Sequence, residues 1–121
     1  AIDNNALIDT IDNSTFIFND AASFGGAISN FADLAPVLIL TISNNQFTAN
    51  TAGVSGGALD NQDGTITNLL TNTFNSNLAL ISGGAIFNLG GTITNESGNL
   101  GNGLAYNNNP DDYLFLPPII L

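Results

Sequence analysis

Apolar and polar residues alternate over short stretches of this chain instead of following a helical period. The alternation is clear in Leu40-Thr41-Ile42-Ser43 and in Ile66-Thr67, and it is typical of half-buried β-strands. Glycine, asparagine and threonine interrupt every window in which an amphipathic helix would need an apolar stripe. The pattern therefore predicts an all-β protein made of short strands separated by turns.

The same residues return along the chain in three copies. Each copy holds a Gly-Gly pair followed by alanine and an aliphatic residue, as in Gly25-Gly26-Ala27-Ile28. A phenylalanine stands nine residues before each pair, and an asparagine follows three residues after that phenylalanine. The first two copies are 31 residues apart and the next two 27, because residues 31–36 contain a loop insertion. Such a period with strand patterning predicts a solenoid in which one copy makes one turn.

We expect a right-handed parallel β-helix of about four turns, with about three short strands in each turn. Equivalent residues then stack at the ~4.8 Å spacing of neighbouring strands. The stacks should be an aromatic column, an aliphatic column and an asparagine ladder at the turns, where asparagine tolerates left-handed backbone. Their members are, in that order, Phe16, Phe47 and Phe74; Ile28, Leu59 and Ile86; and Asn30, Asn61, Asn88 and Asn107. The glycine pairs should allow a close approach of two backbones.

The paired motifs F-x-x-N and G-G-A-[I/L] resemble the repeats of the polymorphic outer membrane proteins of chlamydiae. They occur here as Phe16–Asn19 with Gly25–Ile28, Phe47–Asn50 with Gly56–Leu59, and Phe74–Asn77 with Gly83–Ile86. Large secreted, Asn-rich β-solenoid proteins of bacteria contain similar repeats. The resemblance covers residues 8–107 and implies a β-helix displayed at the cell surface, acting as an adhesin or passenger.

The chain divides into repeats and a tail. Residues 1–107 hold the three copies and a degenerate fourth, and residues 108–121 form an apolar tail in which Pro117-Pro118 blocks helix formation. Two interpretations of the tail stay open: it caps the last turn of its own coil, or it docks on the next subunit. The candidate self-association residues are Tyr113, Leu114, Phe115, Leu116, Ile119, Ile120 and Leu121.

Charge narrows the choice of partners. The chain has ten acids, no Lys, Arg or His, and a net charge of -10. Without basic residues it cannot neutralise phosphates, so we expect no binding to nucleic acid or to anionic membrane surfaces. We expect no membrane insertion either, because no apolar run reaches the roughly 18 residues that span a bilayer. A start at Ala1 suits a mature exported protein or a fragment.

Candidate chemistry is sparse. Catalytic triads need His or Cys, and both are missing. Asp60 and Asp63 flank a tight turn and are weak candidates for a calcium site, although Ca²⁺ prefers six to eight oxygens. We therefore expect no cofactor and no enzymatic activity, with a carbohydrate-active enzyme as the least favoured reading.

The sequence as a whole favours a structural role outside the cell or on its surface. We expect subunits that stack head-to-tail into a filament or matrix through the coil ends and the tail, so that the partner is the chain itself. The alternative is an adhesive passenger module of a larger surface protein that binds a ligand on a host or neighbouring cell.

Overall fold

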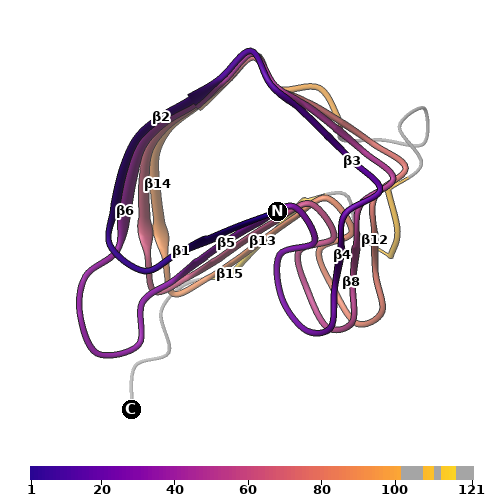
Figure 1. Cartoon of the computed structure of the whole chain (residues 1–121), viewed down its shortest axis with the longest axis horizontal. Coiled ribbons are helices and arrows are strands. Elements are labelled where there is room, and N and C mark those ends of the chain that lie inside the picture. Colours follow the sequence, from indigo (N-terminus) through magenta and orange to yellow (C-terminus); the bar gives the residue numbers. More distant parts are fainter. Residues whose placement is uncertain (102–107, 111–112, 117–121) are drawn as a thin grey trace.

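The computed structural model describes residues 1–101, 108–110 and 113–116. Over these residues the chain winds as a parallel β-solenoid of about four turns, with the N-terminus near the middle of the view along the coil (Figure 1). The described residues contain strands but no helix, and accordingly no helix long and apolar enough to cross a membrane. The predicted all-β parallel solenoid of about four turns is confirmed.

Four sheets, here called A to D, run the length of the coil, and neighbouring strands pair in parallel. Sheet A contains β1 (Ile2–Asn4), β5 (Ile28–Phe31), β9 (Leu59–Gln62), β13 (Ile86–Leu89) and β15 (Tyr113–Leu116). Sheet B contains β2 (Leu7–Asp12), β6 (Leu38–Ser43), β10 (Thr65–Leu70) and β14 (Thr92–Ser97). Sheet C contains β3 (Thr15–Ile17), β7 (Gln46–Thr48) and β11 (Thr73–Asn75). Sheet D contains β4 (Asp20–Ala21), β8 (Thr51–Ala52) and β12 (Leu78–Ala79).

Each complete turn thus has four strands, and the expectation of three is wrong. The additional strand lies in sheet D, where β4, β8 and β12 are two residues long. Two residues cannot display an alternating pattern, so the sequence reads there as a turn.

The predicted core columns are confirmed. The rings of Phe16, Phe47 and Phe74 stack with centroids 4.9 and 4.7 Å apart and nearly parallel planes. Ile28, Leu59 and Ile86 are register partners in sheet A and are fully buried. Equivalent residues lie above one another because one repeat makes one turn. Each interior member of a column is therefore covered on both sides by the members of the neighbouring turns.

The glycine pairs lie in three glycine arches, residues 22–27, 53–58 and 80–85, which connect sheet D to sheet A and fold back beside sheet A (Figure 1). The first glycine of each pair has left-handed backbone, with φ of 62° at Gly25. The second approaches the next arch closely, since a Cβ on Gly26 would lie 2.1 Å from the carbonyl oxygen of Gly57. The expected close approach of two backbones is confirmed.

The predicted ladder of Asn30, Asn61 and Asn88 exists, but its place in the turn differs from the prediction. Asn30, Asn61 and Asn88 hydrogen-bond in series, but they lie within strands of sheet A. Left-handed backbone occurs instead at residues such as Asn13 and Asn44, so the expected left-handed role of the ladder is wrong.

The predicted fourth rung, Asn107, lies outside the described residues. The register partner of Asn88 in the next strand of sheet A is Phe115 of β15. Asn108 joins another ladder and β15 extends sheet A, so a boundary at residue 107 does not separate coil from tail.

Candidate functional site: the two ends of the coil

The N-terminal turn leaves core columns partly uncovered. Ile2, Ile8 and Phe16 begin the columns and are partly buried, packed against the fully buried residues of the second turn. Strands β1, β2, β3 and β4 are the edge strands of their sheets at this end. Edge strands present backbone N–H and C=O groups that can pair with another chain. This end of the described coil is therefore chemically able to accept a further strand in every sheet.

Three asparagine ladders, buried except at Asn19 and Asn99, lie at three corners of the coil. The A–B ladder consists of Asn4, Asn30, Asn61 and Asn88; the B–C ladder of Asn45, Asn72 and Asn99; and the C–D ladder of Asn19, Asn50, Asn77 and Asn108. Each Nδ2 donates to the Oδ1 of the next turn, for example at 2.8 Å from Asn4 to Asn30. In all three ladders the amide N–H groups point towards the C-terminal end and the amide oxygens towards the N-terminal end. The two ends of the coil therefore differ in their hydrogen-bonding groups.

At the N-terminal end the A–B and C–D ladders present acceptors, whereas the B–C ladder begins only at Asn45 in the second turn. The Oδ1 of Asn19 accepts a hydrogen bond of 3.2 Å from the terminal ammonium of Ala1. This donor takes the place of the asparagine amide that a preceding turn would supply. The Oδ1 of Asn4 accepts only the local backbone N–H of Ala6 among the bonds of the described residues. The first asparagine of each of these two ladders thus accepts a hydrogen bond from a backbone nitrogen of its own turn, where the later asparagines accept from the amide of the preceding turn.

At the C-terminal end two of the three ladders are closed within the chain. Asn99 donates to the Oε1 of Glu96 at 2.7 Å, and Asn108 donates to the carbonyl oxygen of Gly101 at 2.8 Å. A carboxylate and a carbonyl thus serve as terminal acceptors where the interior rungs use the next asparagine. In the A–B ladder, Asn88 keeps only the local bond to the carbonyl oxygen of Gly91, which Asn61 also makes to Gly64, and Phe115 takes the position of the next asparagine.

The aromatic column is closed at the same end. Gly101 contributes no side chain above Phe74, and the ring of Tyr113 occupies the space, edge-on to Phe74 with a centroid distance of 5.7 Å. Phe115 then stacks on Tyr113 at 6.3 Å. The change from parallel to perpendicular rings ends the column.

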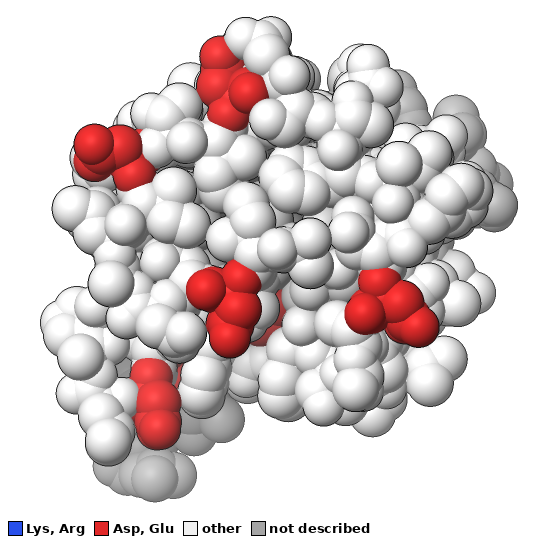
Figure 2. Space-filling view, in the orientation of Figure 1, with Lys and Arg blue, Asp and Glu red and all other residues white. Residues whose placement is uncertain are grey.

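The N-terminal edge strands carry four of the ten acids. Asp3, Asp9, Asp12 and Asp20 lie in β1, β2 and β4. Figure 2 shows acidic side chains spread around the face of the coil seen along its axis, with no basic group among them. Charges on edge strands hinder pairing with other chains. This end therefore has two opposing features: strand edges that are able to pair with another chain, and charges that hinder such pairing.

Asp12 is the most strongly held of these acids. Its carboxylate accepts hydrogen bonds from the Ser43 hydroxyl at 2.6 Å and the Asn44 amide at 2.9 Å. These hydrogen bonds lower the pKa of Asp12 below its usual value, and the bond from Ser43 has the largest effect. Three of the edge acids have Ser or Thr as register partners, namely Asp3 with Ser29, Asp12 with Ser43 and Asp20 with Thr51, so none of these three lies directly against another acid.

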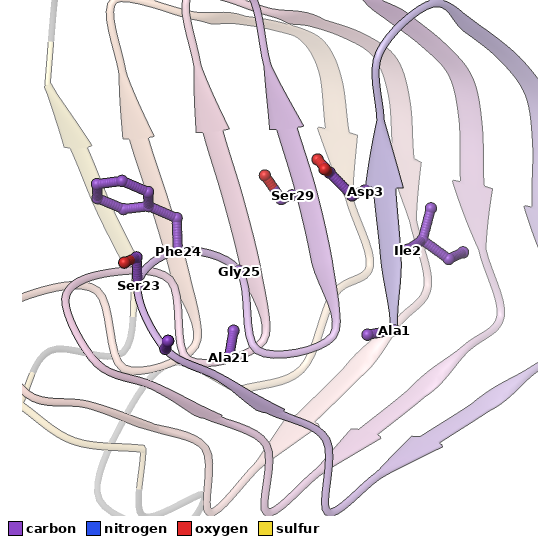
Figure 3. A pocket seen from close by; sticks show the side chains of 9 residues that line it. Ala1, Ile2, Asp3, Ala21, Ser23, Phe24, Gly25 and Ser29 are labelled. Atoms are coloured by element: carbon purple, nitrogen blue, oxygen red, sulfur yellow. The ribbon is translucent and has the colours of Figure 1, made fainter.

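Five side chains of sheet A point out of the coil and form the outer column beneath the arches: Asp3, Ser29, Asp60, Phe87 and Leu114. At the N-terminal end the column opens into a groove of about 420 Å³. Figure 3 shows Phe24 rising from the first arch on one side of the groove and Asp3 and Ser29 on neighbouring strands on the other.

Asp60, predicted as a weak calcium ligand, lies deep in the outer column. Its side chain is 0% exposed, and its Oδ2 accepts a hydrogen bond from the Ser55 hydroxyl of the second arch at 2.6 Å. Its Oδ1 has no partner among the described residues. Burial raises the pKa of this carboxyl to about 6, against the opposing effect of the Ser55 hydrogen bond. The group works as a link between arch and sheet.

Asp63, the second candidate ligand, lies exposed in the turn after β9 with left-handed backbone. Within the part of the chain that is described, no three acidic side chains come together. The structure thus separates a buried carboxyl from an exposed one instead of joining the two in one site.

The predicted self-association residues are divided by the structure. Tyr113, Leu114, Phe115 and Leu116 form β15, parallel to β13 and in register with it. Ile119, Ile120 and Leu121 lie outside the described residues.

The sequence reasoning missed the B–C and C–D ladders and the first rung of the A–B ladder. Signals for the two missed ladders exist, because asparagine stands two residues before Phe47 and Phe74 and also three residues after each phenylalanine of the repeat. Asn4 has no glycine pair before it and so falls outside the repeat motif.

Comparison of the chain with protein-family models, with curated proteins and with solved structures found no match.

Proposed function

We propose that this chain is a structural subunit that assembles head-to-tail with its own copies into a filament or surface matrix outside the cell. One observation carries the proposal: the N-terminal turn has uncovered core columns, edge strands in all four sheets and ladder acceptors bound to local donors. Another turn of the same kind complements all three features. A second copy supplies such a turn in the required orientation, and a heterologous contact of this type extends without closing.

The composition supports an exposed, durable material. A chain without Lys or Arg has no site for trypsin, and a chain without Cys is indifferent to the redox state of its surroundings. The resemblance to repeats of surface proteins points to the same location. The role requires no catalysis and no cofactor, and calcium between copies remains a weaker option that a chelator tests.

Electron microscopy and light scattering of the purified chain over a range of concentrations test the proposal. We expect rods whose length grows with concentration. Monodisperse monomers at every concentration would refute the proposal.

A matched pair of variants assigns the contact to the coil end. Ile8→Lys places a charge in an uncovered core column of β2, whereas Leu7→Lys adds the same charge to the adjacent, exposed residue. Assembly should be lost in the first variant and kept in the second, with circular dichroism showing that both remain folded. Equal assembly by both variants would move the contact away from this end.

An adhesive module is the second candidate, and it is favoured by apolar side chains on the flank of the coil. Phe18, Leu80 and Ile81 are 77%, 70% and 67% exposed, and the latter two lie in the third glycine arch. Exposed apolar groups of this kind serve as contact sites. Leu80→Ser with Ile81→Ser should abolish binding to target cells without affecting assembly, if adhesion is the main role.

A further inference from the structure

We propose that β15 is a removable cap that competes with β1 of a second copy for the edge of β13. The inference rests on the proposed head-to-tail assembly and specifies its control and its register. It assigns Tyr113–Leu116 to the regulation of assembly, whereas the subunit contact itself lies between the fourth turn of one copy and the first turn of the next.

The four sheets differ in length at the C-terminal end of the described coil. Among the described residues, sheet B ends at β14 of the fourth turn, and sheets C and D reach that turn through the bridges of Leu100 and Asn109. Within the described part of the chain, sheet A alone goes one strand further, through β15. A second copy whose β2 pairs with β14 must place its β1 on β13. β15 occupies that position.

The side chains of β1 suit the edge of β13 better than those of β15 do. By the register of the coil, Ile2 of the second copy would lie on Ile86, and Asn4 on Asn88. Asn4 brings the Oδ1 acceptor that Asn61 finds in Asn88 one turn earlier. β15 instead brings Tyr113 and Phe115, neither of which continues the A–B ladder. A buried amide donor with a matched acceptor is more stable than one facing a phenyl ring.

Two further columns agree with this register. Ile8 of the second copy would cover Ile93, the partly buried last member of its own column. In the outer column, Phe87 would lie next to Asp3 of the second copy, where the groove beside Phe24 can take an aromatic ring. The groove at one end and the ring at the other are thus complementary parts of one contact.

A reversible lock on the cap tests the inference in the full-length chain. Leu89 and Leu116 are register partners on β13 and β15 and both lie at the surface. Paired residues in neighbouring strands are ~4.8 Å apart, within the Cα separation that a disulfide spans. The chain has no cysteine of its own, so Leu89→Cys with Leu116→Cys forms a single defined bond. The control is Thr48→Cys with Asn75→Cys, register partners on β7 and β11.

Assembly is measured by light scattering and negative-stain microscopy on oxidised and reduced protein. We expect the oxidised β13–β15 pair to remain monomeric and to assemble on reduction, whereas the control assembles in both states. Equal assembly of the locked and reduced forms overturns the cap while leaving the proposed function intact. Stronger assembly of the locked form also overturns it, because β15 would then be part of the contact. Monomers under all conditions, in the wild-type chain as well, overturn both proposals.

A release variant gives the opposite change. Leu114→Pro removes a backbone donor from β15 without altering the rest of the coil, and it should shorten the delay before assembly. In that background, copies with Asp3→Cys and copies with Phe87→Cys should form a mixed disulfide on mixing. Copies with Asp3→Cys and with Thr48→Cys should not. Slower assembly of Leu114→Pro, or a mixed disulfide at Thr48 and not at Phe87, overturns the assigned cap or register.

Discussion

The two ends of this coil are built from the same repeat but finish in different ways. At the N-terminal end the columns stop at Ile2, Ile8 and Phe16, which are partly exposed. At the C-terminal end a perpendicular ring and a carboxylate, those of Tyr113 and Glu96, close the aromatic column and the B–C ladder. A repeat therefore does not determine what happens at its ends. The terminal turns must substitute residues, and those substitutions decide which edge can take another strand.

The largest expected effect compares two phenylalanines of one column. Phe74→Ala removes a ring that is 0% exposed between Phe47 and Tyr113, which should lower the free energy of unfolding by about 4 kcal/mol. Phe16→Ala removes the partly exposed first ring and should cost roughly 1–2 kcal/mol, because less apolar area is lost. Urea unfolding measures both. Equal losses would mean that the N-terminal end is as well covered as the C-terminal end.

The next effect compares two acids of the outer column, Asp60 in its interior and Asp3 at its open end. The pKa of Asp60 is raised to about 6 in the fold, from 3.8. The folded state therefore holds the proton more tightly than the unfolded state does. The stabilisation from protonation is fully present below pH 3.8 and is lost as the pH rises through about 6.

Replacing the carboxyl by an amide should remove this loss. At pH 7, Asp60→Asn should raise the free energy of unfolding by up to roughly 3 kcal/mol, the equivalent of a shift of about two pKa units. Its stability should also change less between pH 4 and 7 than that of the wild-type chain. Asp3→Asn is the control for the loss of one charge at the exposed end. A steeper pH dependence in Asp60→Asn would contradict the assignment.

A smaller effect concerns Glu96, which follows Ile11, Ile42 and Leu69 in one core column. Stacking of a second copy would place an isoleucine against this carboxylate, and burying an unpaired charge is costly. Glu96→Gln keeps an acceptor for Asn99 and removes the charge. Its stability should change by less than about 0.5 kcal/mol, while its assembly, followed by light scattering, should begin at lower concentration. Unchanged assembly would show that this residue does not oppose stacking.

The smallest expected effect comes from extending a ladder. Phe115→Asn places an amide above Asn88 and should stabilise the fold by about 0.5–1 kcal/mol if β15 keeps its register. Under the cap hypothesis the same substitution tightens β15 and delays assembly. Thermal unfolding and light scattering give the two measurements, and earlier assembly would contradict the hypothesis.

The columns could be predicted because identity repeated at fixed spacing gives register directly. The aromatic column and the glycine arches follow from this logic alone. Sheet D could not be predicted, because its strands are two residues long. The fifth strand of sheet A was missed because Tyr-Leu-Phe-Leu shares little with Ile-Phe-Asn-Leu, the segment of β13 with which it pairs.

The burial of Asp60 is the clearest failure of the sequence reasoning. A carboxyl beside a turn is normally exposed, and no arch of a neighbouring repeat is needed to explain why this one is buried. The chain's own second arch, through Ser55, covers it. Only the three-dimensional path of that arch reveals the contact.

The uniform direction of the ladders gives the coil an electrical polarity. Each amide in a ladder polarises the next one, so hydrogen bonds in series strengthen one another. Three such series aligned with the axis add their dipoles and do not cancel. A rod built from these coils would have unlike tips, and elongation should proceed faster at one of them, as in other polar fibres.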